Sequence, residues 1–138
     1  MSGSQELERL RTEGKLADVL LMAWAATEML LEGIVLMEYG LYDGDTDSPL
    51  CKPLTSMSYD AKLALMRDVG LVPADDYKIL EQFRTDRNDL FHQDSLLLSR
   101  ITDDMRDELM SHALLATRVT EVLFEKALQE KERKKRRA

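Results

Sequence analysis

One short stretch, residues 83–94, concentrates the side chains of this chain that could do acid–base or phosphate chemistry. It holds Arg84, Arg87, Asn88 and His92 within nine positions. An arginine offers a planar fork of N–H donors to a phosphate and stabilises the extra charge of a transition state. A histidine titrates near neutral pH and can move a proton to or from a ribose hydroxyl, while an asparagine can orient either group. Together these side chains suffice for metal-free RNA cleavage by the adjacent 2′-hydroxyl.

Helical geometry places this cluster beside the core-facing side of its helix. With Arg84 at zero and about 100° per residue, Asn88 falls near 40° and His92 near 80°. Arg87 and Phe91 fall near 300° and 340°, so the five side chains share an arc of about 140°. A neighbouring subunit could dock there, since the cluster does not lie opposite the core. The core side centres near about 240° by the same count, on three apolar residues, Ile79, Phe83 and Leu90.

The alternative is a solvated helix surface without chemistry. Asp86, Asp89 and Asp94 surround the cluster and can form ordinary ion pairs with its arginines and histidine. Such pairs are common on exposed helices, so the residue types alone leave both possibilities open. The second histidine, His112, falls on an apolar helix face and is predicted to be a hydrogen-bonded core or interface residue. Trp24 is predicted to lie in the core or in a dimer interface.

The apolar periodicity predicts an all-α fold, an up-down antiparallel bundle of four or five helices in a single domain over residues 1–138. Charged residues make up 33% of the chain, which is typical of a helix-rich globular protein rather than a disordered one when Gly and Pro are this scarce. The helix count depends on whether Gly14 separates a short leading turn from the first long helix. The expected segments are a helix over 16–37, a loop over 41–57, a helix over 58–69, a helix opened by Pro73, a connector over 95–100, a helix capped by Thr102, and a basic, disordered tail over 131–138.

The most apolar run of the chain extends from Leu16 to Met37. Asp18, Glu28 and Glu32 interrupt it, so a buried helix is predicted rather than a membrane span. Its apolar face is wider than one stripe requires, which predicts contact with the bundle core on one side and with a second subunit on the other. The N-terminal residues lack the pattern of a signal peptide, and Cys51 is the single cysteine, which together favour the cytoplasm.

The net charge of −7 is unevenly distributed. Residues 131–137 carry six basic residues and one acidic residue, a local +5, which leaves −12 for the remainder. An acidic body does not attract nucleic acid generally, so any RNA contact is expected at the central cluster or the tail. The run Asp43–Asp47 resembles the start of a calcium loop, but Ser48 stands where the loop requires Gly and Leu54 where it requires Glu. No metal and no cofactor are therefore expected.

The hexad Arg87-Asn88-Asp89-Leu90-Phe91-His92 resembles the signature of the HEPN superfamily: an Arg, a polar residue, a few further residues and a His near the end of a bundle helix. Residues 58–63 and 70–72 also resemble the segment that leads to this motif in HEPN families, including the mannitol-repressor-like group. Glu28 lies in an Ala- and Leu-rich run similar to their first helix. The resemblance covers most of the chain and implies an all-α, HEPN-like bundle that dimerises, with the two motifs facing each other across a two-fold axis.

Carried over to this chain, the resemblance implies a role for each residue of the motif. Arg87 would bind and polarise the scissile phosphate, His92 would transfer a proton or position the 2′-hydroxyl, and Asn88 would support both. Arg84 would be an accessory RNA contact, and Glu28 would either pair with Arg84 or Arg87 or be an exposed residue. The implied activity is that of a metal-independent endoribonuclease that leaves 2′,3′-cyclic phosphate ends, an activity found in toxins and defence effectors.

The chain also departs from the HEPN pattern. Relatives paired with nucleotidyltransferase antitoxins usually carry a Tyr two residues after the His, where this chain has Asp94, so control by modification of that tyrosine is not expected. Bulky Phe91 precedes the His, where many relatives have Ala.

Three functions from different classes remain open. The first is the homodimeric HEPN endoribonuclease acting on RNA, which is favoured because Arg87, Asn88 and His92 are all present. The second is a non-catalytic HEPN dimer that regulates transcription or binds a partner, such as a cognate antitoxin or a regulatory protein. The third is an unrelated helical-bundle interaction protein in which the motif is coincidental.

Overall fold

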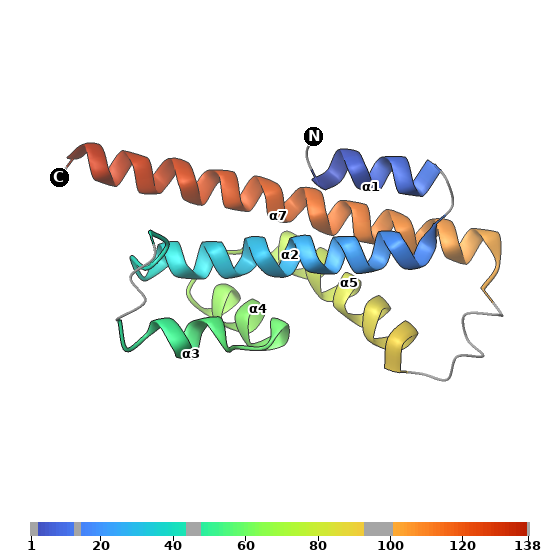
Figure 1. Ribbon diagram of the computed structural model, residues 1–138, viewed down its shortest axis with the longest axis horizontal. Helices are drawn as coiled ribbons and strands as arrows, with labels where there is room; N and C mark the ends of the chain where they lie inside the picture. The colour runs from blue at the N-terminus through green and yellow to red at the C-terminus, as the bar shows by residue number, and fades with distance from the viewer. Residues whose placement is uncertain (1–2, 13–14, 44–47, 93–100, 138) are drawn as a thin grey trace.

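The computed structural model describes residues 3–12, 15–43, 48–92 and 101–137, and within them the chain is entirely helical and turn, with no strand. This confirms the all-α class. This described part forms six helices, whose arrangement is shown in Figure 1. Their bounds are α1 Gly3–Thr12, α2 Leu16–Glu38, α3 Cys51–Thr55, α4 Tyr59–Asp68, α5 Ala74–His92 and α7 Asp103–Arg137.

Local capping residues set several of these boundaries where the sequence predicts them. The Ser58 hydroxyl accepts a hydrogen bond from the Ala61 N–H at 3.1 Å, which caps α4. The Thr102 hydroxyl accepts one from the Met105 N–H at 3.2 Å at the start of α7. Beyond the ends of α2 and α4 lie two glycines with φ of 72° and 78°, Gly40 and Gly70, a conformation that side chains with a Cβ rarely adopt.

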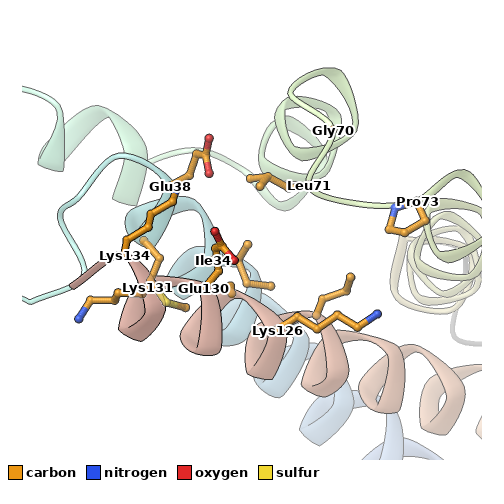
Figure 2. Close-up of a pocket in the computed structure, with 12 residues that line it drawn as sticks. Ile34, Glu38, Gly70, Leu71, Pro73, Lys126, Glu130, Lys131 and Lys134 are labelled. Atoms are coloured by element: carbon orange, nitrogen blue, oxygen red, sulfur yellow. The ribbon is translucent and has the colours of Figure 1, made fainter. Parts of the chain in front are cut away.

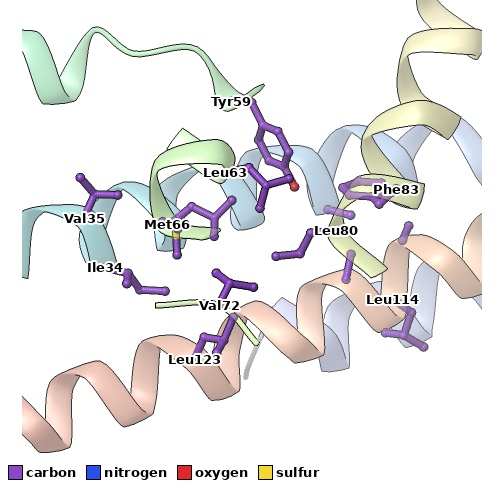
Figure 3. Close-up of a cluster of buried hydrophobic side chains, with 14 of the residues drawn as sticks. Ile34, Val35, Tyr59, Leu63, Met66, Val72, Leu80, Phe83, Leu114 and Leu123 are labelled. Atoms are coloured by element: carbon purple, nitrogen blue, oxygen red, sulfur yellow. The ribbon is translucent and has the colours of Figure 1, made fainter. Parts of the chain in front are cut away.

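The helices pack around the pair α2 and α7, which share the most extensive contact in the molecule. These two helices run in the same direction, while α1 and α5 run the opposite way (Figure 1). The approach of α2 to α7 is close at Gly33, where an added Cβ would lie 2.8 Å from Cε2 of Phe124. Figure 3 shows the core that this arrangement buries. Its central side chains include Leu31, Leu63, Met66, Leu80, Phe83 and Met110, each at most 1% exposed.

Two segments differ from the sequence prediction. The expected loop over 41–57 contains the short helix α3, whose Leu54 is 9% exposed and packs into the core. The expected disordered tail continues α7 as a helix through Arg137. Lys and Arg are good helix formers and complement the negative end of the helix dipole, and Arg133 pairs with Glu130 one turn earlier, so the helix has no local reason to stop at residue 131.

Other predictions fall outside the described residues. These are the calcium-like run beyond Asp43 and the leucine-bearing connector over 95–100.

The short α1 forms a helix separate from α2 and packs against both α2 and α7.

Helix α2 has the length and composition of a membrane span: it has 23 residues and contains an 18-residue window with a mean hydropathy of 1.8, of which 44% is buried inside the protein. Its inner face lies in the core. Its outer face leaves Leu21 53% exposed, Met22 37% and Met29 67%. The side chains that make α2 so apolar therefore divide between the core and an uncovered surface of the protein.

Candidate functional site

Helix α5 carries the cluster that the sequence singles out. Arg84, Arg87 and Asn88 are all half-buried, as expected for side chains at the edge of a core. His92 lies at the last position of α5, and its side chain, like that of Phe91, is outside the described part of the structure. All four residues therefore lie on one helix; the structure places the side chains of Arg84, Arg87 and Asn88, and the placement of the imidazole stays a prediction.

Arg87 lies against the indole ring of Trp24. Its guanidinium carbon Cζ is 4.0 Å from the centroid of the Trp24 ring, well within the range of a cation–π contact. Trp24 also stacks on Tyr59 of α4, with centroids 4.2 Å apart and planes at 25°, and touches Phe83 at 6.0 Å. Trp24 is half-buried and packs against the core, and it joins α2, α4 and α5 at the site.

Arg84 is held in a different way. Its Nη2 donates to Oε1 of Glu81 at 2.6 Å, and its Nε lies 3.4 Å from Oδ1 of Asp60. The hydrogen bond to Glu81 and the negative charges of Glu81 and Asp60 raise the pKa of the Arg84 guanidinium above its ordinary value. The pairing of Arg84 with Glu28, one of the predicted alternatives, is replaced by these two carboxylates. Arg84 consequently has its charge largely balanced before any ligand arrives.

The side chain of Tyr59 is a buried phenol that stacks on Trp24. The residue is 4% exposed, and this burial raises the pKa of the Tyr59 hydroxyl well above its ordinary value. The Thr27 hydroxyl lies close enough to offset part of that shift, but the contact falls short of hydrogen-bond geometry, and Thr27 donates instead to the Trp24 carbonyl at 3.1 Å. The nearby charges of Glu81, Asp60 and Glu28 add to the increase in the pKa. The phenol is therefore neutral and serves as an apolar surface for the indole.

Asp86 turns away from this face and pairs with α7. Its Oδ2 lies 2.6 Å from Nδ1 of His112, and its Oδ1 accepts a hydrogen bond from Gln82 at 2.8 Å. Because a carboxylate can only accept, the His112 Nδ1 carries the hydrogen. His112 is therefore hydrogen-bonded, as predicted, and its side chain is 29% exposed rather than buried in the core. Asp86 is 8% exposed and has two donors, so its charge is directed away from the cluster that it borders in the sequence.

Sequence reasoning missed the partner of Asp86, although a signal was present. By the same helical count as above, Asp86 falls at about 200°, within about 40° of the core side of α5. A buried acid requires donors, and His112 was already expected on an apolar face.

A pocket lined by described residues lies away from this cluster. Figure 2 shows it between the end of α2, the link from α4 to α5, and the C-terminal half of α7. Its volume is about 370 Å³, with an apolar floor that includes Ile34, Leu71 and Leu123. Its rim has mixed charge, with Lys126, Lys131 and Lys134 beside Glu38 and Glu130.

Within the described residues, no three His, Cys, Asp or Glu side chains lie together as a metal ion would require. The chemistry available at the cluster on α5 is therefore that of a guanidinium, an amide and, by sequence, an imidazole. No family model, no curated protein and no solved structure matches this chain. What the cluster does is accordingly inferred from its own side chains.

Proposed function

We propose that this chain is a HEPN-like, metal-independent endoribonuclease that acts as a homodimer in the cytoplasm. The observation that carries the proposal is the placement of Arg87, whose guanidinium is held on the Trp24 ring, one position before Asn88 and five before His92 on α5. Transfer at a phosphodiester requires a fixed cation and a titratable group; the structure describes the first, and the sequence supplies the second as His92. The observed all-α architecture is compatible with a HEPN-like bundle.

In this reaction the ribose 2′-oxygen attacks the adjacent phosphorus and the bond from phosphorus to the 5′-oxygen breaks. His92 accepts the 2′-hydroxyl proton or positions that hydroxyl, and the departing 5′-oxygen takes up a proton. Arg87 balances the charge that accumulates on the phosphate oxygens, and Asn88 orients the reacting groups. The products are a 2′,3′-cyclic phosphate and a 5′-hydroxyl, and no step uses a metal ion.

The outer face of α2 supports the homodimer. Leu21, Met22 and Met29 are exposed there, and exposed Ala25 lies between them on the same side of the helix. A cluster of large apolar side chains that no described segment covers is typical of a protein–protein contact. Leu21 lies one turn before Trp24, so a two-fold contact through this face would bring both Arg87 sites towards the symmetry axis.

The test is cleavage of single-stranded RNA in EDTA, with the ends analysed for 2′,3′-cyclic phosphate. Both Arg87→Ala and His92→Ala should reduce the rate at least about 100-fold, as expected for loss of a charge-stabilising or proton-transfer group. Arg118→Ala is the matched control, since Arg118 is an exposed arginine on α7, 3.5 Å from Glu8. Equal rates in the wild type, Arg87→Ala and His92→Ala would refute the enzyme.

A non-catalytic dimer is the second candidate, and the acidic surroundings of the site favour it. Glu81 and Asp60 already occupy Arg84, and the chain carries a net charge of −7, both of which oppose binding of a polyanion. Such a dimer would bind a protein partner, a cognate antitoxin or a transcription regulator among them. Absence of cleavage by a protein that is dimeric in solution would favour this candidate.

The dimer itself is tested by light scattering at micromolar concentration. Met29→Lys should convert the dimer to a monomer because it places a charge in the apolar face of α2. Val69→Lys is the control, since Val69 is also exposed, at 44%, but lies at the end of α4. A wild-type protein that is monomeric under these conditions would contradict a composite site.

A further inference from the structure

Trp24 is the single tryptophan of the chain, and it lies at the centre of the site on α2. Three side chains contact its ring: Tyr59 from α4, and Phe83 and Arg87 from α5. Two of these neighbours belong to the innermost core, since Tyr59 is 4% exposed and Phe83 is fully buried. The indole is therefore held in place by two packed aromatic rings, Tyr59 and Phe83, and its ring also contacts the Arg87 guanidinium.

We propose that Trp24 is a positioning residue that orients the Arg87 guanidinium for a phosphate, an inference that rests on the function proposed above. An arginine side chain has four rotatable bonds and loses much conformational freedom when it binds a ligand. A guanidinium held on an indole has already lost part of that freedom before the ligand arrives. The entropy cost of ordering the Arg87 side chain is therefore smaller in the binding and reaction steps.

The type of contact matters as much as its strength. Stacking uses the face of the guanidinium, whereas a phosphate binds to the N–H groups in its plane. The contact between Trp24 and Arg87 is therefore compatible with bidentate binding of two phosphate oxygens. The indole positions a cation without competing for the donors that the substrate needs.

The experiment compares three substitutions at Trp24 with one elsewhere on the chain. Trp24→Phe keeps a ring, while Trp24→Leu and Trp24→Met remove it; the flexible Met variant serves if Trp24→Leu fails to fold. Tyr42→Leu is the matched control, since Tyr42 is an aromatic residue whose ring pairs with Phe124, 5.9 Å away. For each protein, kcat and KM for RNA cleavage are measured, together with the anisotropy of a labelled RNA oligonucleotide and the NMR signal of the Arg87 Nε–Hε group.

Removal of the ring should lower kcat about 10- to 100-fold, since a misplacement of about 1 Å can cost that much. KM should rise because RNA binding weakens, Trp24→Phe should keep most of the activity, and Tyr42→Leu should match the wild type. The Arg87 Nε–Hε signal should lose its ring-current displacement in Trp24→Leu. A Trp24→Leu or Trp24→Met protein that folds, loses that displacement and still cleaves at the wild-type rate would overturn the proposal.

The oligonucleotide measurement separates this inference from the proposed enzyme. If the wild type does not cleave RNA, the proposed activity fails, but RNA binding that weakens in Trp24→Leu and not in Tyr42→Leu still supports positioning of Arg87 in a binding site. If the wild type does not cleave RNA and both variants bind the oligonucleotide equally, the positioning role fails as well. If the wild type cleaves RNA and all Trp24 variants match it, the positioning role alone fails.

Discussion

The contact between Asp86 and His112 links the helix that carries the site to α7, and we predict that its loss destabilises the fold measurably. Asp86→Ala removes an acceptor 2.6 Å from His112 Nδ1 and 2.8 Å from the Gln82 amide. A hydrogen bond to a charged group contributes about 1.5–3 kcal/mol net, and a neutral one about 1 kcal/mol. Alanine recovers up to about 0.7 kcal/mol through its higher helix propensity.

The expected loss for Asp86→Ala is therefore about 2–3 kcal/mol in the free energy of unfolding. Values towards the lower end of this range are expected because His112 is 29% exposed, so water can replace part of the lost contact. For a chain of this length the midpoint of thermal unfolding should fall by about 10 °C.

The assay is a double-mutant cycle of Asp86→Ala and His112→Ala, measured by urea unfolding followed by far-UV circular dichroism. The coupling energy should be about 1–3 kcal/mol, as for residues in direct contact. The control cycle pairs His112→Ala with Glu108→Ala, because Glu108 is 3.9 Å from His112 Nε2 and 71% exposed, and it should give a coupling below about 0.5 kcal/mol. A coupling for Asp86 and His112 no larger than that of the control would refute this account of the α5–α7 link.

Two further predictions concern α4 and the phenol beneath the site. Ser58→Ala should destabilise by about 1 kcal/mol through loss of the cap on the Ala61 N–H, while the exposed control Ser56→Ala should stay within about 0.5 kcal/mol of wild type in urea unfolding. Because burial raises the pKa of Tyr59, the folded state keeps a neutral phenol that the unfolded chain ionises near about pH 10. The resulting stability is complete below that pH and is lost as the pH rises towards the folded pKa, by up to about 1.4 kcal/mol per pH unit relative to Tyr59→Phe. Parallel stability profiles of the two proteins between about pH 8 and pH 11 would contradict this.

Features governed by neighbouring residues were predictable from the sequence. The hydroxyls of Ser58 and Thr102 and the positive φ angles of Gly40 and Gly70 act within one helical turn, and the helix boundaries there are as predicted. The all-α class follows from the same local patterns. The position of Arg84, Arg87 and Asn88 beside the core likewise follows from the 3.6-residue period of one helix.

Features governed by distant residues were not predictable. Helix α3 forms in a Gly- and Pro-containing loop because Leu54 finds a place in the core. The contacts of Arg87 with Trp24 and of Asp86 with His112 join residues 63 and 26 positions apart, and their formation depends on how the helices cross. The helical end of α7 was missed for a different reason, since a basic run was treated as solvated tail although its residues favour a helix.

The pairing of α2 with α7 has a consequence for the synthesis of the chain. These helices share the largest contact, yet about 65 residues separate the end of α2 from the start of α7. At about 5–20 residues per second, a ribosome would hold the apolar α2 without its main partner for roughly 3–13 s. During that interval a 23-residue helix, with an 18-residue window whose mean hydropathy is 1.8, is exposed to chaperones and membranes. The nascent chain thus passes through a period of vulnerability that the finished protein no longer shows.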